Sequence, residues 1–265
     1  MGLGRRSLVR GIAGAAAGVV VAGCGESGDS GVGRGAPAVS AGSGKGTSSP
    51  EAPASGAAKA VALPAEVSRA DSGRAEVALT FHGQGEPAQV ERLLGVLEKA
   101  GVRVTVLAVG TWLGEYPSMA RRVLSGGHEL GNHTENHLDM SGMDAAAAYG
   151  EIAACADRLR ALTGSQGRWF RPSQTQYATD VVKEQAVRAG YPTCLSFSLD
   201  SRDHTEPGPP VVVRNVLGKV RAGDVVSLHF GHDGTTVAMP RILAGLQDKG
   251  LRPVTAGELF GPAGG

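Results

Sequence analysis

From about residue 75 onward the chain alternates short apolar runs with amphipathic helical patterns. Repeated strand–helix units predict a parallel sheet covered by helices, and near-continuous apolar runs are typical of strands buried on both faces. Proline at several helix starts and glycine at several helix ends support the boundaries. The expected strands are 77–81, 103–109, 128–132, 168–170, 193–199, 225–229 and 252–254, and the expected helices are 87–100, 117–125, 145–163, 180–189, 210–220 and 240–249. This pattern is compatible with both an open sheet and a closed barrel.

Polar side chains follow the ends of five expected strands. They are His82, His133, Arg171, Asp200 and His229. In parallel α/β folds the residues that act on ligands lie at the carboxyl ends of the strands, on one side of the sheet. We therefore expect these side chains to share one site.

The first 24 residues have the organisation of an export signal. Arg5 and Arg6 precede an apolar stretch at 11–22, which is shorter than the roughly 20 apolar residues that span a bilayer. Paired arginines are typical of a twin-arginine signal, and Cys24 follows small residues as in a lipobox. We expect cleavage before Cys24, acylation of its thiol, and a lipoprotein on the outer face of the cell membrane. An ordinary signal peptide that happens to contain Cys24 is the alternative.

Residues 25–62 are mostly Gly, Ser, Ala and Pro, with almost no large apolar side chain. Such a segment cannot bury enough surface to offset the entropy lost on ordering. It is therefore predicted to be a flexible tether between the lipid anchor and one folded domain at 63–265.

Net charge and cysteine content bear on nucleic-acid binding and on a possible disulfide. The formal net charge is +1, which gives no basic field for a nucleic-acid partner, and none is expected. Beyond the lipobox, two cysteines remain, Cys155 and Cys194. An exported protein permits a disulfide between them, and two buried, reduced thiols are equally compatible with the sequence.

The strongest local signal for chemistry is the pair His133 and His137, four residues apart after an expected strand. On one helical turn the two rings would share a face and could bind one metal ion. Two solvated surface histidines are the alternative. Arg171, Asp203 and His229 are weak signals individually, since they fit a solvated loop, a turn and a hydrogen-bonded structural histidine.

Taken in order, these residues resemble the NodB homology domain of polysaccharide deacetylases, over about residues 77–260. That family has five ordered motifs on a distorted (β/α) barrel, so the resemblance implies this fold in a single domain. Its second motif, His-Ser/Thr-x-x-x-His, implies that His133 and His137 bind the metal. Its third motif, Arg-Pro after a strand, implies that Arg171 orients the catalytic base.

The fourth and fifth motifs imply the acid side of the mechanism. The fourth is an Asp-containing turn usually closed by Trp, and it resembles residues 200–204, with His204 in place of Trp. Asp203 is then implied to tune the acid histidine. The fifth, Leu-x-His or a close variant, implies that Leu228 lines the acetyl pocket and that His229 acts as general acid.

The first motif departs from the family pattern. The family has Thr-Phe-Asp-Asp-Gly, in which the first Asp is the base and the second binds metal, whereas residues 80–86 read Thr-Phe-His-Gly-Gln-Gly-Glu. His82 could complete a three-histidine site of the catalytic zinc type, which we favour narrowly. His82 could instead be the general base, with two protein ligands on the metal or a third from Glu86. Alternatively, the site binds glycan without catalysis.

The resemblance implies a metal-dependent hydrolase that removes N-acetyl groups from a polysaccharide. Zinc is the expected divalent metal, because it activates a water molecule near neutral pH. An exported and tethered enzyme would meet peptidoglycan or another N-acetylated wall glycan, and we expect a monomer. A catalytically impaired glycan-binding lipoprotein is the main alternative, and a hydrolase of small amides or esters is a weaker one.

Overall fold

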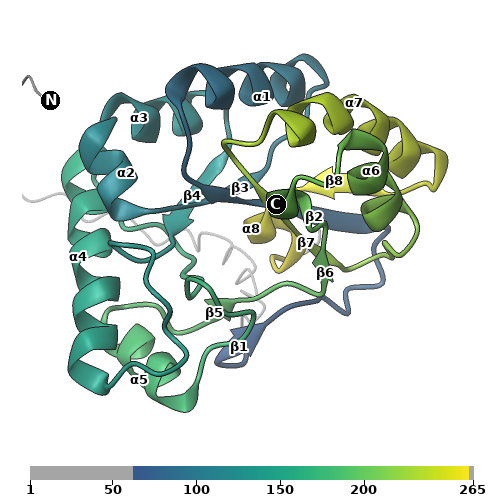
Figure 1. Cartoon of the computed structure of the whole chain (residues 1–265). Coiled ribbons are helices and arrows are strands. Elements are labelled where there is room, and N and C mark those ends of the chain that lie inside the picture. Colours follow the sequence, from purple (N-terminus) through teal and green to yellow (C-terminus); the bar gives the residue numbers. More distant parts are fainter. Residues whose placement is uncertain (1–61, 263–265) are drawn as a thin grey trace, which may run out of the picture. The chain divides into compact units, whose positions relative to one another are not determined.

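In a computed structural model of the chain, strand β2 lies at the centre of a parallel sheet (Figure 1). The order is β4–β3–β2–β7–β6, and β8 pairs with the first residues of β2. Register places His82 of β2 opposite His229 of β7, so these two histidines lie side by side. The strands are β1 (Glu66–Val67), β2 (Glu76–Gly83), β3 (Thr105–Ala108), β4 (Glu129–Asn132), β5 (Cys194–Leu195), β6 (Leu199–Asp200), β7 (Val225–His229) and β8 (Arg252–Val254).

The structure describes residues 62–262. The expected signal peptide at 1–24, its Cys24, and the expected tether at 25–62 except its last residue lie outside the described residues and stay predictions. Among the described residues, no helix has both the length and the apolar character needed to cross a membrane.

Short pairings join the two ends of the sheet and make it a distorted barrel. Phe170 bridges in parallel to Asn132 at the end of β4 and to Cys194 at the start of β5. Strand β5 pairs with β1, and the chain after β5 continues into β6, which pairs with β7. The predicted α/β barrel of a single domain is therefore confirmed. The expected strand at 168–170 is only one bridge, and the expected strand at 193–199 is divided into β5 and β6.

Helices connect the strands and pack on the outer face of the sheet (Figure 1). Local signals explain several starts: Pro87 is in the first turn of α1, and the side chains of Asp144 and Thr179 cap α4 and α5. The helices are α1 (Pro87–Lys99), α2 (Gly110–Glu115), α3 (Ser118–Ser125), α4 (Ala145–Thr163), α5 (Asp180–Arg188), the 3-10 turn η1 (Asp203–Thr205), α6 (Pro209–Leu217), α7 (Asp233–Asp248) and α8 (Ala256–Leu259).

Helix α7 differs from its prediction. It begins at Asp233, and Pro240, expected at its start, lies inside it. A proline inside a helix removes one backbone hydrogen bond. Here Ala238 and Met239 are fully buried beside it, and tertiary packing overrides the local signal. The sequence analysis also did not predict β1, α2 and α8, because these elements are too short to show a hydrophobic period.

Alternation along β2 decides which side chains face the interior of the barrel. Leu79 and Phe81 pack in the hydrophobic core between the sheet and the helices. Ala78 packs in a second cluster inside the barrel, and Thr80 and His82 follow it at a period of two. The strand therefore delivers His82 to the interior at its carboxyl end.

Both cysteines of the folded part are reduced and buried. Cys155 packs in the core beneath the helices, and Cys194 packs in a separate cluster around α4 and α5. Burial raises the pKa of each thiol to about 12. The two residues thus act as small apolar side chains, the second of the two interpretations left open by the sequence.

Candidate active site

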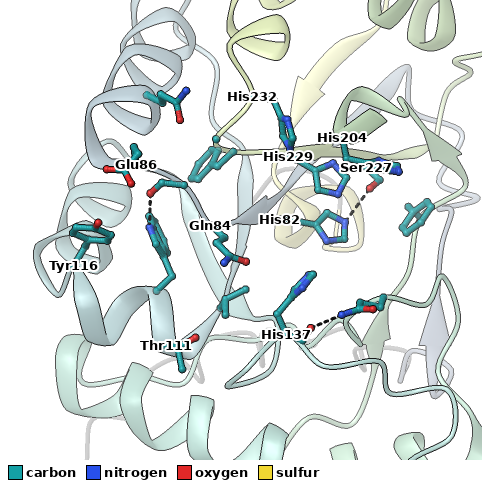
Figure 2. A pocket seen from close by; sticks show the side chains of 18 of the residues that line it. His82, Gln84, Glu86, Thr111, Tyr116, His137, His204, Ser227, His229 and His232 are labelled. Atoms are coloured by element: carbon teal, nitrogen blue, oxygen red, sulfur yellow. Dashed lines mark hydrogen bonds between the residues drawn. The ribbon is translucent and has the colours of Figure 1, made fainter. Parts of the chain in front are cut away.

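The carboxyl ends of the strands surround a cavity of about 940 Å³ that is rich in histidine (Figure 2). Five of the seven histidines of the chain line it: His82, His137, His204, His229 and His232. Aromatic side chains contribute to its walls: Trp112, Tyr116, Phe197 and Phe230. Of the five polar residues expected at strand ends, His82, Asp200 and His229 line this cavity. The other two, His133 and Arg171, are fully buried and contact His82.

His82, His133 and His137 form what we call the three-histidine cluster. One nitrogen from each ring lies within 4.8 Å of the others. Nδ1 of His82 lies 2.7 Å from Nε2 of His133, and the ring centroids of His133 and His137 are 5.0 Å apart. Glu86 is exposed at the start of α1 and does not belong to the cluster.

Hydrogen bonds determine which nitrogen atoms face the cluster. Nδ1 of His133 lies 2.9 Å from the carbonyl oxygen of Arg171, which can only accept, so this nitrogen carries the proton and Nε2 presents a lone pair. Nε2 of His82 lies 2.9 Å from Oγ of Ser227. A proton on that nitrogen has an acceptor, and Nδ1 of His82 then presents its own lone pair to the cluster. Partners of this kind orient metal-bound histidines.

The loop that carries His133 and His137 is not the helical turn that their spacing suggests. Thr134 and His137 have φ angles of 69° and 56°, in the left-handed region. Oδ1 of Asn132 accepts from the amide of Thr134 at 2.8 Å, and Oγ1 of Thr134 accepts from the amide of His137 at 3.2 Å. Such bonds compete with helical ones. The prediction of a shared helix face is therefore wrong, although the two rings do converge.

Burial keeps the three imidazoles neutral. It lowers the pKa of His82 and of His133 well below the ordinary value, and the positive charge of Arg171 adds to this effect. The pKa of His137 is also lowered, by burial and then by His229. Neutral imidazole is the form that binds metal, whereas a general base works best with a pKa near the working pH. The electrostatics therefore favour His82 as a ligand.

The donor set of the cluster fits a zinc ion. Three neutral imidazole nitrogens, with a further position open to water, are a known ligand set of catalytic zinc. The cluster opens through His82 and His137 to the cavity, so water and a substrate can reach it. The residues present are thus sufficient to hold a divalent metal without the two carboxylates of the family motif.

Arg171 is fully buried and is held by the backbone. Nε donates to the carbonyl of Leu195 at 2.8 Å, and Nη2 donates to Oγ1 of Thr80 at 2.9 Å and to the carbonyl of Ser196 at 3.2 Å. Nη1 lies 3.3 Å from Nε2 of His82. Burial lowers the pKa of Arg171 to about 9, which leaves it cationic at neutral pH. The arginine thus lies beside residue 82, as the resemblance implies, but faces an imidazole there.

Asp203 and His229 form a second pair beside the cluster. Oδ1 of Asp203 lies 2.7 Å from Nδ1 of His229, and Oδ2 accepts from the amide of His229 at 2.9 Å and from Oγ1 of Thr235 at 2.7 Å. Burial alone would raise the pKa of Asp203, but these hydrogen bonds outweigh it and lower the pKa overall. The His229 ring stacks on His82 with centroids 4.3 Å apart. An anionic carboxylate therefore fixes the His229 ring next to the cluster.

Leu228 does not lie where the sequence placed it. It is fully buried in the core beneath the helices, and it is absent from the cavity wall. Ser227 and His229, on either side of it, line the cavity because side chains alternate along a strand. The position two residues before the histidine is Ser227. The wall residue that the family's Leu-x-His motif supplies is therefore Ser227 in this chain, and the assignment to Leu228 is corrected.

Several residues of the cavity were missed by sequence reasoning. Strand alternation around His229 was a sufficient signal for Ser227. Trp112 and Tyr116 lie in and just after α2, whose six residues are too few to show a helical period. Nothing in the sequence distinguished His232 from an ordinary loop histidine.

Comparison with known proteins agrees with the fold and the site. The polysaccharide deacetylase family model matches residues 69–194. A peptidoglycan-N-acetylglucosamine deacetylase of Bacillus cereus is 32% identical over 196 residues, which cover 69% of this chain and 87% of that protein. A chitooligosaccharide deacetylase of Bradyrhizobium is 30% identical over 195 residues, which cover 68% of this chain and 88% of that protein. The fold and the site define a barrel protein of the deacetylase class. The chain belongs to the polysaccharide deacetylase family.

Solved structures share the same barrel. A mutant of a Bacillus anthracis pseudoenzyme of the CE4 family, described as having restored enzymatic activity, has a TM-score of 0.71 at 25% identity and covers 76% of this chain and 72% of that chain. A family 4 carbohydrate esterase from Streptomyces lividans, in complex with acetate, has a TM-score of 0.63 at 25% identity. That comparison covers 67% of this chain and 91% of the esterase. The structural neighbours of this chain thus include both an esterase and a pseudoenzyme.

Proposed function

We propose that this chain is a metal-dependent deacetylase that hydrolyses N-acetyl groups of a cell-wall polysaccharide, with peptidoglycan as the expected substrate. One observation carries the proposal: the ligand atoms of His82, His133 and His137 converge at the cavity, next to the Asp203–His229 pair. A metal site and an oriented acid are the two elements that amide hydrolysis needs.

The three-histidine cluster would hold the metal. A bound zinc ion supplies a water molecule of lowered pKa and polarises the acetyl carbonyl. The carbonyl of Arg171 and the hydroxyl of Ser227 hold the His133 and His82 rings in place. Preformed orientation of this kind lowers the cost of ordering the ligands when metal binds.

His229 would supply the proton for the leaving amine. Its Nδ1 is held by Asp203, so Nε2 is the nitrogen available to the substrate. Asp203 stays anionic because four hydrogen bonds stabilise its charge, and it therefore stabilises the protonated His229 ring. The atoms would balance as follows: the C–N bond breaks, the hydroxyl of water joins the acetyl group, and the amine takes the proton of His229. The remaining proton of water passes to solvent, from which His229 is protonated again.

The cavity suits a polysaccharide better than a small molecule. Aromatic side chains along its wall offer apolar faces on which sugar rings can pack, while Gln84, Gln174 and Gln176 add polar groups. One relative is named as a peptidoglycan-N-acetylglucosamine deacetylase and another as a chitooligosaccharide deacetylase. This likeness supports an N-acetylated glycan as the substrate class.

A second candidate function is glycan binding without catalysis. The observation that favours it is the absence of both carboxylates of the first family motif at His82 and Gly83. A structural neighbour is described as a pseudoenzyme, so this barrel also occurs in inactive forms. In this alternative the cavity binds the sugar chain and the histidines hold no catalytic metal.

We also propose that the chain is exported and anchored by lipid on Cys24, at the outer face of the cell membrane. The proposal rests on the paired Arg5 and Arg6, the short apolar stretch, and the small residues before the cysteine. Cys24→Ala should release the protein from the membrane fraction. Equal membrane retention of the Cys24→Ala chain and the parent would contradict the anchor.

The catalytic proposal is tested by measuring bound metal and acetate release on the same preparations. The purified chain should bind one divalent ion tightly and release acetate from N-acetylated glycans, including peptidoglycan. His133→Ala should lose both the ion and the activity, whereas the matched substitution of another cavity histidine, His232→Ala, should keep the ion. Binding of glycan without metal and without acetate release would support the second candidate function. Release from small acetylated amides alone would contradict the polysaccharide substrate.

A further inference from the structure

A second group of metal-binding side chains lies in the same cavity. Asp203, His204 and His229 each offer one ligand atom, and these atoms lie within 4.8 Å of one another. The ring centroids of His204 and His229 are 4.9 Å apart. The group shares no residue with the three-histidine cluster, although stacking of His229 on His82 places the two groups next to each other.

His204 takes no part in the side-chain hydrogen bond between Asp203 and His229. It lies on the turn η1, and its amide donates to Oδ1 of Asp203 at 2.9 Å, which ties the backbone at 204 to the same carboxylate. The side chain is exposed at the cavity wall, and within residues 62–262 its ring makes no hydrogen bond. Its nitrogen atoms are therefore available to a ligand from the cavity.

His232 lies nearby but differs in this respect. Its Nδ1 lies 3.3 Å from a carboxylate oxygen of Glu206, and it is not part of the group. Its ring centroid is 6.1 Å from that of His229. His232 therefore offers a matched control for His204: a histidine of the same cavity without the same convergence.

We propose that Asp203, His204 and His229 form a second divalent-metal site, of the zinc type, which binds more weakly than the three-histidine cluster. Two imidazoles and one carboxylate are a donor set that proteins use for zinc, with the remaining coordination positions open to solvent. The site is weaker because Asp203 already accepts hydrogen bonds from His229 and Thr235. The exposed His204 must also lose rotational freedom when metal binds.

A metal ion in this second site would prevent His229 from acting as the general acid. A metal ion on a ring nitrogen of His229 takes the lone pair used in proton exchange and displaces a proton to solvent. Excess zinc should therefore inhibit deacetylation reversibly, and this consequence rests on the proposed function. The binding of a second metal ion does not rest on it, since it involves other residues.

Metal counting tests the second site directly. The purified full chain is dialysed against a series of free zinc concentrations, and bound zinc is counted by mass spectrometry. The parent should bind one zinc at low and two at high free zinc. His204→Phe keeps an aromatic ring but removes both nitrogen donors. Loss of a partner that only supports a ligand costs about 10–100-fold in metal affinity, so loss of the ligand itself should weaken the second site at least tenfold.

Two further variants separate the two sites. His133→Ala should lose the tightly bound zinc and keep the weakly bound one. If the His133→Ala chain does not fold, His137→Ala serves as the alternative variant. His232→Phe should bind both ions as the parent does. Inhibition by excess zinc should be present in His232→Phe and absent in His204→Phe.

The outcomes distinguish this site from the proposed function. A second zinc bound equally tightly by His204→Phe and the parent would overturn the proposal, as would a parent that binds only one zinc at millimolar free zinc. Either result leaves the first site and acetate release unaffected. A parent chain that binds no zinc at low free zinc would instead contradict the proposed function. Zinc bound at the second site could still be measured at high free zinc.

Discussion

Nη1 of Arg171 lies 3.3 Å from Nε2 of His82, and within residues 62–262 this buried guanidinium meets no carboxylate. When the Nε2 proton of neutral His82 points to Oγ of Ser227, the guanidinium lies beside the ring without donating a hydrogen bond to it. Protonated His82 would instead place one buried cation against another, which is costly in a region of low dielectric. A general base must become protonated during its work, whereas a metal ligand must not. The contact between the two residues therefore suits His82 as a ligand.

The acid side of the site gives the first prediction. His229→Ala should retain the tight metal ion and lower acetate release by about 10²–10⁴-fold, the usual contribution of a general acid. Asp203→Asn should also lower it, because the uncharged amide no longer stabilises the protonated ring. Thr235→Val removes only one of four hydrogen bonds to the Asp203 carboxylate and should have a smaller effect. An unchanged rate in His229→Ala, measured without excess zinc, would remove His229 from the mechanism.

The altered first motif gives the second prediction. Restoring the family pattern with His82→Asp and Gly83→Asp meets an obstacle at the second position. A Cβ atom on Gly83 would lie 2.8 Å from Cγ1 of Val106 and 3.0 Å from Cα of Ala108 in the neighbouring strand. The new side chain would thus press on β3, and overpacking of this kind costs typically 1–3 kcal/mol.

Urea denaturation checks this packing argument. Gly83→Ala should lower the free energy of unfolding by about 1–3 kcal/mol. Val106→Ala makes space, so the double variant should lose less than the sum of the two single losses. A Gly83→Ala chain as stable as the parent would show that β3 moves freely. In that case the two-carboxylate motif could be restored without further change.

The third prediction concerns pH and the metal-free chain. The pKa of His133 is held well below its ordinary value of 6.5 by burial, so the unfolded chain binds a proton that the folded chain does not. Stability from this group is therefore constant above pH 6.5 and falls as pH decreases below it. One such group contributes about 1.4 kcal/mol per pH unit. Unfolding in urea with a chelator, at pH 7.5 and at pH 5.5, measures the slope, and His133→Asn should flatten it. A slope unchanged by this substitution would contradict a neutral, buried His133.

Strand–helix alternation was sufficient to predict a parallel sheet covered by helices, because buried parallel strands carry near-continuous apolar runs. The closed barrel was predicted only from the resemblance to the deacetylase family. The same alternation placed His82 and His229 at strand ends. The loop at His133 and His137 could not be predicted, since its shape depends on hydrogen bonds from Asn132 and Thr134 that compete with a helical turn. The assignment of Leu228 to the acetyl pocket was wrong for a simpler reason. Side chains alternate along a strand, so Ser227, not Leu228, shares the face of His229.

The role of residue 82 was left open by the sequence because it depends on contacts between distant segments. His82 meets His133 from the loop after β4, Ser227 from β7 and Arg171 from the segment after Phe170. No spacing along the chain encodes these distances. The structure supplies them.

If His82 is the third metal ligand, His82→Ala should lose the tight metal ion and acetate release together. If it is the base, the same change should spare the metal and lower only the rate.

Ser227→Ala is a second test of the role of His82. The Ser227 hydroxyl accepts from a proton on Nε2 of His82, and a proton on Nε2 leaves Nδ1 free to bind metal. Ser227→Ala removes that acceptor. For a ligand, Ser227→Ala should weaken metal affinity by about 10–100-fold, as loss of such supporting partners does. For a base, it should leave metal affinity unchanged. His232→Ala controls for the general effect of removing a cavity histidine. Tight metal binding that survives both His82→Ala and Ser227→Ala would exclude His82 from the ligand set, and the two-histidine site that remains would favour a glycan-binding role for the barrel.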